Sequence, residues 1–271
     1  MRIGTMGPEG TFSDAAAKKL APGKRAVVVY FANIHEIFDA MYKGEIDAAV
    51  VPVENSSEGT VGATVDNLYR HTFLIRDEAV IDVHHSLAVL PHAGKISRVV
   101  SHPQALAQCS QFLYKRFPGA VLVPASSTVG AMEQVMESGE KETAVVGPEE
   151  AAKRLGLRII ARNIEDEPYN KTRFFLVGKR DQPGVRKAKT SMILHEMVDR
   201  PGLLYDVLGE FAKRGINLTK IESRPAKKRL GKYFFVIDFE GSRLDKKVKE
   251  ALDGLKKFVS VKMLGTYPKR Y

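Results

Sequence analysis

The chain has 271 residues, of which 44% are hydrophobic and 27% are charged, a composition that is ordinary for one large or two average globular domains. No apolar run approaches the roughly 20 residues that a membrane span needs, and the first residues lack the apolar segment of a signal peptide. The single cysteine, Cys109, excludes a disulfide within the chain. We therefore expect a cytoplasmic protein with no membrane partner.

The net charge of +10 is unevenly distributed along the sequence. Residues 1–179 contain 20 Lys and Arg against 21 Asp and Glu, whereas residues 180–271 contain 22 against 11. A basic segment of this kind can bind nucleic acid. No zinc-finger spacing, RNA-binding motif or aromatic-interleaved basic stripe accompanies it in the sequence. We therefore expect a solvated, lysine-rich domain and no nucleic-acid partner.

Strand and helix patterns alternate through the first 179 residues. A strand at 25–31 precedes a helix that a capping pair, Asn33 and Glu36, opens and Gly44 closes. The later patterns predict a strand at 46–55, a helix at 58–70, a strand at 98–101, a helix at 103–116, a strand at 120–123, a helix at 127–138, a strand at 143–147 and a helix that begins at Pro148. The alternation predicts parallel sheets that helices cover on both faces.

A long extended segment at 73–91 interrupts this alternation. We interpret it as a crossover from one α/β lobe to another, with the return near 155–175. The expected lobes are about 1–76 plus 159–179 for lobe one and about 77–158 for lobe two. Two such crossings leave a cleft between the lobes, and ligands bind in crevices of this kind.

The last third of the chain predicts a separate, smaller domain. Residues 180–190 are polar and basic and contain Pro-Gly, so we expect a linker there. The following patterns are a strand at 190–198, a helix at 201–214, strands at 217–224 and 231–239, a helix at 243–255 and a strand at 258–265. The order βαββαβ is that of a ferredoxin-like α+β domain, which we place at 191–271, after an α/β two-lobed domain at 1–179.

Polar side chains stand where the chain enters a buried strand near residue 174. Phe174 begins an apolar run that extends to Val177, yet Asn170, Thr172 and Arg173 come directly before it. A charge that leaves water must be paired, because an unpaired buried charge is strongly destabilising. Local conflicts of this kind concentrate at functional sites. The stretch is therefore our first candidate for an active site.

Four segments and a C-terminal block resemble, in chain order, the prephenate dehydratases that carry a C-terminal ACT domain. The stretch from Asn170 to Phe174 resembles their Asn-x-Thr-Arg-Phe signature. The other segments are "GPEGTFSDAA" at 7–16, "VPVENSSEGTVGATVDNL" at 51–68, "SHPQALAQC" at 101–109, and, in the last domain, the pair "RPGLLYDVL" at 200–208 and "INLTKIESRP" at 216–225. The resemblance covers nearly the whole chain.

The resemblance implies a two-lobed fold like that of type II periplasmic binding proteins, with the active site in the cleft. The implied reaction converts prephenate to phenylpyruvate with loss of water and carbon dioxide, in phenylalanine biosynthesis, and requires no cofactor or metal. It also implies homodimers or homotetramers through the ACT domains, and feedback inhibition by phenylalanine. Two alternatives stay open: arogenate as the substrate, and a non-catalytic, amino-acid-sensing binding protein.

Three adjacent residues are the expected catalytic group. We assign Arg173 to the pyruvyl carboxylate of the substrate, Thr172 to the leaving hydroxyl as a hydrogen-bond donor, and Phe174 to an apolar wall. The structural alternatives are an ion pair of Arg173 with Glu54, a strand cap or packing role for Thr172, and plain core for Phe174.

Six further residues are expected to bind the substrate: Thr11, Ser13, Asn55, Ser56, Gln104 and Asn170. Asn55 and Ser56 have the alternative of capping the following helix. We expect Gln108 and Cys109 to be structural. His84, His85, His92 and His102 show no metal-ligand spacing, so we expect no metal site.

The resemblance also implies an allosteric phenylalanine site that two stretches of the ACT domain enclose across a dimer interface. Its residues are Gly202, Leu203, Leu204, Asn217, Leu218, Glu222, Ser223, Arg224 and Pro225. The family usually has alanine where this chain has Leu203. We expect the added bulk to weaken or retune phenylalanine binding, because overpacking is destabilising.

Overall fold

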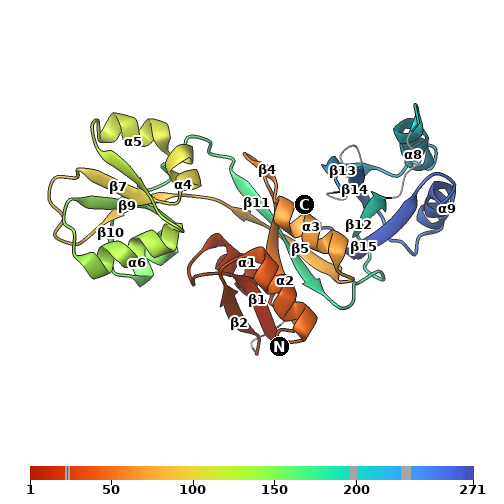
Figure 1. The fold of residues 1–271 in the computed structure, drawn as a ribbon, viewed down its shortest axis with the longest axis horizontal. Coiled ribbons are helices and arrows are strands. Elements are labelled where there is room, and N and C mark those ends of the chain that lie inside the picture. The colour runs from red at the N-terminus through yellow and green to blue at the C-terminus, as the bar shows by residue number, and fades with distance from the viewer. Residues whose placement is uncertain (22, 24, 196–199, 227–232) are drawn as a thin grey trace. The chain divides into compact units, whose positions relative to one another are not determined.

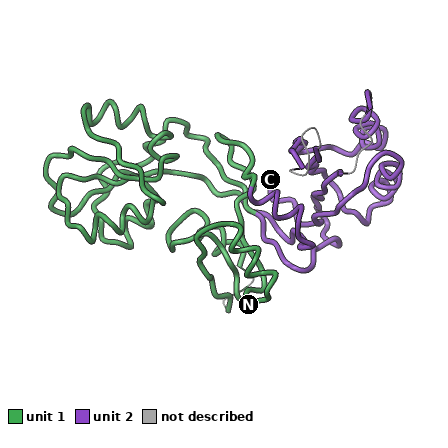
Figure 2. The backbone as a smooth tube through the Cα atoms, in the orientation of Figure 1, with its two compact units in different colours: residues 1–62, 80–174 green, residues 63–79, 175–271 purple. Residues whose placement is uncertain are grey.

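The computed structural model describes residues 1–21, 23, 25–195, 200–226 and 233–271. These residues form two compact units, which Figure 2 shows in different colours. Unit 1 comprises residues 1–62 and 80–174, and unit 2 comprises residues 63–79 and 175–271. The chain passes between the units within strands β5 (Leu74–Asp82) and β11 (Lys171–Gly178) and at the start of helix α3 (Gly62–Arg70).

The first sheet has the strand order β2-β1-β3-β11-β5, and β4 pairs with β3. Its other strands are β1 (Arg2–Met6), β2 (Val27–Phe31), β3 (Ala48–Asn55) and β4 (Gly59–Thr60). Strand β1 pairs in parallel with both β2 and β3. Helices α1 (Phe12–Leu20) and α2 (Ile34–Lys43) pack against these strands. The predicted caps of α2 are confirmed, because the Asn33 side chain accepts a hydrogen bond from the Glu36 N–H and Gly44 is left-handed.

The second sheet has the order β10-β6-β9-β7-β8. Its strands are β6 (Ser86–Val89), β7 (Arg98–Ser101), β8 (Val121–Pro124), β9 (Thr143–Gly147) and β10 (Arg158–Ala161), and its helices are α4 (Pro103–Gln108), α5 (Ser110–Arg116), α6 (Thr128–Ser138) and α7 (Glu149–Arg154). Helices cover both faces, as expected: Val99 of β7 packs with α4 and α5, and the next residue, Val100, packs with α6 and α7.

The sheets are mixed rather than parallel throughout, which corrects the sequence-based expectation. Strand β7 is parallel to β8 and β9, whereas β6 is antiparallel to β9 and β10. The antiparallel strands are the ones that connect the sheets. The expected crossover segment 73–91 supplies β5 to the first sheet and β6 to the second, and the return supplies β10 and β11 (Figure 1). Because β6 follows β5 directly, no helical crossover sets its direction.

The predicted helix at 103–116 is interrupted at Cys109, which ends α4 and begins α5. The helix is interrupted because Asp166, which is distant in the sequence, bonds the backbone at this point. The Asp166 N–H donates to the carbonyl of Gln108 at 2.7 Å, and the Asp166 carboxylate accepts from the Gln111 N–H at 3.2 Å. These bonds satisfy backbone groups that the interruption frees.

The predicted helix at 58–70 begins later than expected, at Gly62. Residues 54–60 instead form a tight hairpin in which Asn55 pairs with Gly59. The Asn55 side-chain oxygen accepts hydrogen bonds from the N–H groups of Ser57 and Glu58 at 3.0 and 3.1 Å, and it thereby closes the turn. Similarly, Pro148 is the N-cap of α7 rather than its first helical residue.

The C-terminal domain has the predicted βαββαβ order. Its elements are β12 (Ala188–His195), α8 (Leu203–Ala212), β13 (Leu218–Pro225), β14 (Tyr233–Glu240), α9 (Lys246–Leu255) and β15 (Ser260–Pro268). The sheet is antiparallel, in the order β13-β14-β12-β15. Met192 and Leu194 of β12 pack on its helical side with Val207, Phe211 and Leu255. Two predicted strand ends, 196–198 and 231–232, lie outside the described residues.

The other face of this sheet carries several buried polar groups, which are paired within unit 2. The ammonium group of Lys189 lies 3.1 Å from the Glu78 carboxylate of β5, and both side chains are almost fully buried. Ser191 donates to Asp238 at 2.6 Å and also bonds Tyr267. These buried polar groups are paired, as their loss of water requires. Among the described helices, none has both the length and the apolar composition that a membrane crossing requires.

Candidate active site

A cavity of about 480 Å³ lies in unit 1 and is lined from both sheets. Its size is in the usual range for small-molecule sites. Apolar side chains, including Phe12, Ile34, Val83 and Phe174, share the wall with hydroxyl and amide groups. Glu58 is the only Asp, Glu, Lys or Arg among the lining residues, all of which belong to the described part of the chain. The cavity can therefore hold a compact ring that carries polar substituents.

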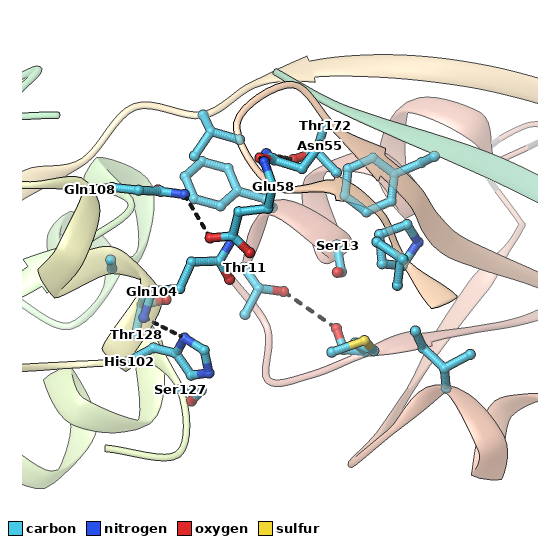
Figure 3. A pocket seen from close by; sticks show the side chains of 18 of the residues that line it. Thr11, Ser13, Asn55, Glu58, His102, Gln104, Gln108, Ser127, Thr128 and Thr172 are labelled. Carbon is cyan, nitrogen blue, oxygen red and sulfur yellow. Dashed lines mark hydrogen bonds between the residues drawn. The ribbon is translucent and has the colours of Figure 1, made fainter. Parts of the chain in front are cut away.

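Thr172 faces this cavity from the start of β11 (Figure 3). Its hydroxyl oxygen accepts a hydrogen bond from the side-chain N–H₂ of Asn55 at 2.9 Å. The same amide group donates to the side-chain oxygen of buried Asn170 at 2.7 Å. The Thr172 oxygen is therefore held by a donor, and its hydrogen is directed away from Asn55.

Arg173 does not line the cavity, which corrects the expectation that Thr172 and Arg173 face it together. Successive side chains of a strand point to opposite faces, so Thr172 and Phe174 share the cavity side and Arg173 lies on the other. The Arg173 side chain is only 5% exposed and lies 3.6 Å from the Glu54 carboxylate. The structure thus has the ion pair that the sequence left open as the alternative.

Three helices begin at the cavity wall. Thr11 caps α1, Ser127 caps α6 and His102 caps α4, each by accepting a hydrogen bond from a first-turn N–H. The other lining residues at these starts are Phe12, Ser13, Gln104, Ala105 and Thr128. First-turn N–H groups have no acceptor within their own helix. Together with the helix dipoles, these N–H groups can stabilise a carboxylate at a wall that has no Lys or Arg.

His102 presents a defined nitrogen to the cavity. Its Nδ1 accepts the backbone N–H of Gln104 at 3.3 Å. A nitrogen that accepts a hydrogen bond carries no proton, so Nε2 is the ring nitrogen left to carry one. Figure 3 shows His102 beside Gln104, with Ser127 and Thr128 near it. The sequence shows no metal-ligand spacing around His102 and does not predict this placement of its ring.

A hydrogen-bonded chain connects the two sides of the cavity wall. Gln108 of α4 donates to the Glu58 carboxylate at 3.4 Å and bonds the Nε2 of His85 at 3.0 Å. Burial lowers the pKa of His85, so its ring is neutral at physiological pH. Because the Gln108 oxygen accepts, the His85 proton is on Nε2. Gln108 lines the cavity, although we expected it to be only structural.

Six of the nine expected catalytic and substrate-binding residues line the cavity: Thr11, Ser13, Asn55, Gln104, Thr172 and Phe174. Besides Arg173, the exceptions are Ser56 and Asn170. The Ser56 hydroxyl accepts the Lys171 N–H at 2.9 Å and donates to the Tyr169 carbonyl, so it joins the end of β3 to β11. Asn170 supports Asn55 from behind. Glu58, His102, Ser127 and Thr128 were not predicted, although the last three stand at recognisable helix starts.

Cys109 and the histidines form no second reactive centre in the described part of the chain. Cys109 is buried in the core of lobe two, and burial raises the pKa of its thiol. The thiol therefore stays protonated, which fits the packing role that the sequence predicts. Among the described residues, no group of three or more His, Cys, Asp or Glu side chains is placed to hold a metal ion.

Comparison with family models decides the assignment of the chain. A model described as prephenate dehydratase matches residues 3–182, and one described as ACT domain matches residues 191–256. The chain belongs to the prephenate dehydratase family. This confirms the resemblance in the sequence motifs, and it agrees with the placement of the Asn-x-Thr-Arg-Phe stretch beside a cavity.

Curated relatives support the assignment over nearly the whole length. A protein of Methanocaldococcus jannaschii named prephenate dehydratase is 39% identical over 267 residues, which are 96% of this chain and 96% of the relative. A protein of Stutzerimonas stutzeri named bifunctional chorismate mutase/prephenate dehydratase is 38% identical over 272 residues, which are 99% of this chain and 73% of the relative.

Solved structures confirm the fold of this prephenate dehydratase family member. The prephenate dehydratase of Arthrobacter aurescens in complex with L-Phe has a TM-score of 0.90 and is 34% identical, covering 99% of this chain and 90% of that one. A second structure, of GqqA, described as a novel type of quorum quenching acylase, has a TM-score of 0.86 and is 30% identical, covering 99% of this chain and 98% of that one.

The residues expected to bind phenylalanine lie at the start of α8 and along β13. Gly202 is left-handed and caps α8, and Leu203 is packed in the domain core. Glu222 forms an ion pair with Arg224 at 3.2 Å. The other expected residues in this domain are Leu204, Asn217, Leu218, Ser223 and Pro225. Ser223 and Pro225 lie on the exposed side of the strand.

Proposed function

We propose that this chain converts prephenate to phenylpyruvate, water and carbon dioxide. The observation that carries the proposal is the Thr172 hydroxyl, which faces a cavity of suitable size while Asn55 occupies one of its oxygen lone pairs. This arrangement makes Thr172 a hydrogen-bond donor toward a bound ligand. Such a donor is what a departing hydroxyl needs, because negative charge develops on its oxygen.

The polar wall supports binding of a dianion. Prephenate has two carboxylates, and the first turns of α1 and α6 supply N–H groups at the cavity. We assign Ser13 and the first turn of α1 to one carboxylate and Gln104 to the other polar end of the substrate. The Thr11 hydroxyl donates to the Met6 carbonyl and accepts the Asp14 N–H, so Thr11 supports this turn instead of binding the carboxylate. Arg173 supports the site through Glu54, at the end of the strand that carries Asn55, rather than by touching the substrate.

The reaction needs little more than a positioned donor and an apolar surface. The bond between the ring and its carboxylate breaks, and the electron pair enters the ring as carbon dioxide leaves. The bond between the ring and its hydroxyl breaks at the other end, and the hydroxyl takes up one proton to leave as water. Phe12 and Phe174 provide apolar surface on the cavity wall. Removing the ring carboxylate from water favours its loss as a neutral gas.

We also propose that L-phenylalanine inhibits the enzyme by binding the ACT domain between two copies of the chain. The matching ACT model and a solved neighbour that holds L-Phe support this proposal. Assembly into a homodimer or homotetramer and a cytoplasmic location belong to the same proposal.

The test is to incubate purified protein with prephenate and measure the formation of phenylpyruvate. The variant Thr172→Val keeps the side-chain shape but lacks the hydroxyl, and we expect its kcat to fall about 10²–10³-fold, the loss typical for one preorganised donor. Equal turnover by wild type and variant would remove the role of the hydroxyl.

Parallel assays on the same preparation test the competing functions. Arogenate replaces prephenate in one assay, and acylase activity is measured in another because a solved neighbour is described as an acylase. Turnover of arogenate alone would make the chain an arogenate dehydratase. Absence of any turnover, together with binding of L-phenylalanine, would favour the non-catalytic sensor.

A further inference from the structure

The side chain of Asn55 has no hydrogen-bonding capacity left for a ligand. Its Oδ1 accepts the backbone N–H groups of Ser57 and Glu58. Its Nδ2 donates to Asn170 Oδ1 at 2.7 Å and to Thr172 Oγ1 at 2.9 Å, with a longer contact to the Lys171 carbonyl at 3.3 Å. An amide side chain has two donor hydrogens and two acceptor lone pairs. All of these positions are occupied although Asn55 is at the cavity wall.

The surrounding backbone fixes the orientation of this amide. A backbone N–H can only donate, so the atom that faces Ser57 and Glu58 must be the oxygen of Asn55. The nitrogen therefore faces Thr172 and Asn170. Asn170 is 2% exposed, and its own backbone carbonyl accepts the Val83 N–H at 2.8 Å, which anchors it in turn.

We infer that Asn55 is a positioning residue that acts through Thr172 and does not bind the substrate. This inference rests on the proposed function. Because Asn55 donates to Thr172 Oγ1, the hydroxyl hydrogen cannot point toward Asn55 and is available to the cavity. The amide thus converts a freely rotating hydroxyl into an oriented donor before the substrate binds. This role replaces the substrate contact that the sequence predicted for Asn55.

Two segments that are far apart in the sequence meet at the Thr172 hydroxyl. Asn55 ends β3, while Asn170 and Thr172 stand at the start of β11, and β3 and β11 are neighbours in the sheet. Asn170 holds one hydrogen of the amide so that the other is directed at Thr172. A turn-closing role alone would use only the oxygen of Asn55. The hydrogen bonds of the Asn55 nitrogen are the ones that reach the Thr172 hydroxyl.

The experiment is a double-mutant cycle on prephenate turnover with Asn55→Ala, Thr172→Val and both changes together. We expect Asn55→Ala to lower kcat about 10²-fold and to change KM less than about threefold, because no substrate contact is lost. In the Thr172→Val background, Asn55→Ala should have no further effect on kcat, since its only route to the reaction is already removed.

The variant Asn55→Asp gives a second measurement that keeps the turn intact. It has the same shape and can still accept the N–H groups of Ser57 and Glu58. The Asn170 amide, which now accepts from Asn55, can turn its nitrogen to the introduced carboxylate, so the variant should fold. The introduced carboxylate can only accept at neutral pH, and it draws the Thr172 hydrogen away from the cavity. We expect a loss in kcat similar to that of Asn55→Ala, with partial recovery as the pH falls and the carboxyl group becomes protonated and able to donate.

The control is Val99→Ala, a cavity-creating change in the core of lobe two at a residue that does not line the site. It should lower the unfolding midpoint and leave kcat unchanged, which separates lost stability from lost orientation. Additive losses in the cycle, a tenfold rise in KM at unchanged kcat, or full activity of Asn55→Asp would each overturn the role of Asn55. Wild-type protein without prephenate turnover would instead overturn the proposed function, and this role with it.

Discussion

The guanidinium group of Arg173 lies 3.6 Å from the Glu54 carboxylate. The side chains of Arg173 and Thr172 lie on opposite faces of β11, and Thr172 lines the cavity. To bind a substrate carboxylate directly, the Arg173 side chain would have to reach the face of the strand that lines the cavity. The neighbouring residues Thr172 and Phe174 line the cavity, and Arg173 between them does not. We therefore expect Arg173 to contribute to activity through the structure of the strand.

Replacing Arg173 by methionine tests this assignment. We expect Arg173→Met to lower the free energy of unfolding by about 1–3 kcal/mol, because it removes the partner of a charged group, and to change KM for prephenate less than about threefold. Unfolding by urea and steady-state kinetics measure the two effects. A tenfold higher KM at unchanged stability would restore the direct contact that the sequence suggested.

The residues of the site differ in how far the sequence could predict them. Thr172 and Phe174 line the cavity, and a recognisable motif names both in the sequence. Arg173 belongs to the same motif, but adjacent strand residues face opposite sides, and the sequence does not say which side is the cavity. Glu58 and Gln108 could not be placed, because they meet only when a hairpin of one lobe approaches a helix of the other.

The elements themselves follow the sequence where local chemistry defines them. Both caps of α2 and the βαββαβ order of the last domain are correct because capping residues and apolar periodicity are local properties. The break between α4 and α5 is not local, since it depends on Asp166, which is far away in the sequence. The start of α3 was missed because a side chain, that of Asn55, closes a turn that the helical pattern conceals.

Leu203 is the first residue of α8 and is buried in the domain core. It is 9% exposed and packs with Met192, Leu194 and Val207 in the core of the ACT domain. We therefore expect Leu203→Ala to leave a cavity and to lower the free energy of unfolding by about 2–5 kcal/mol. Leu204→Ala, at a partly exposed neighbour, should cost less.

Circular dichroism during urea unfolding measures the stability of these two variants, and calorimetry measures L-phenylalanine binding to each. An unchanged stability of Leu203→Ala combined with tighter L-phenylalanine binding would show that the bulk of Leu203 projects into the effector site, as the sequence suggested. Loss of stability would identify it as a core residue instead.

Helix α3 follows the hairpin of residues 54–60 directly along the chain and belongs to unit 2, together with the ACT domain. It begins two residues after β4, the strand that pairs with the end of β3 at Asn55. Within unit 2, the Asp66 carboxylate of α3 lies 3.3 Å from the guanidinium of Arg224. The ring of Tyr69 stacks on Phe234, and Lys262 donates to the Tyr69 carbonyl at 2.6 Å. The helix is therefore tied to the domain that we expect to bind phenylalanine.

Arg224 is one of the expected effector residues, so a ligand that moves it changes its bond to Asp66. Coupling between two sites requires such a differential contact. We expect Asp66→Asn to leave kcat and KM for prephenate unchanged, because Asp66 does not line the cavity. The concentration of L-phenylalanine that gives half-maximal inhibition should rise about 5-fold or more, the lower end of typical allosteric coupling. Calorimetry should still detect L-phenylalanine binding.

Asp253→Asn is the matched control, since Asp253 pairs with Lys256 on the exposed side of α9. Equal inhibition of Asp66→Asn, Asp253→Asn and wild type would show that the bond between Arg224 and Asp66 does not carry the coupling.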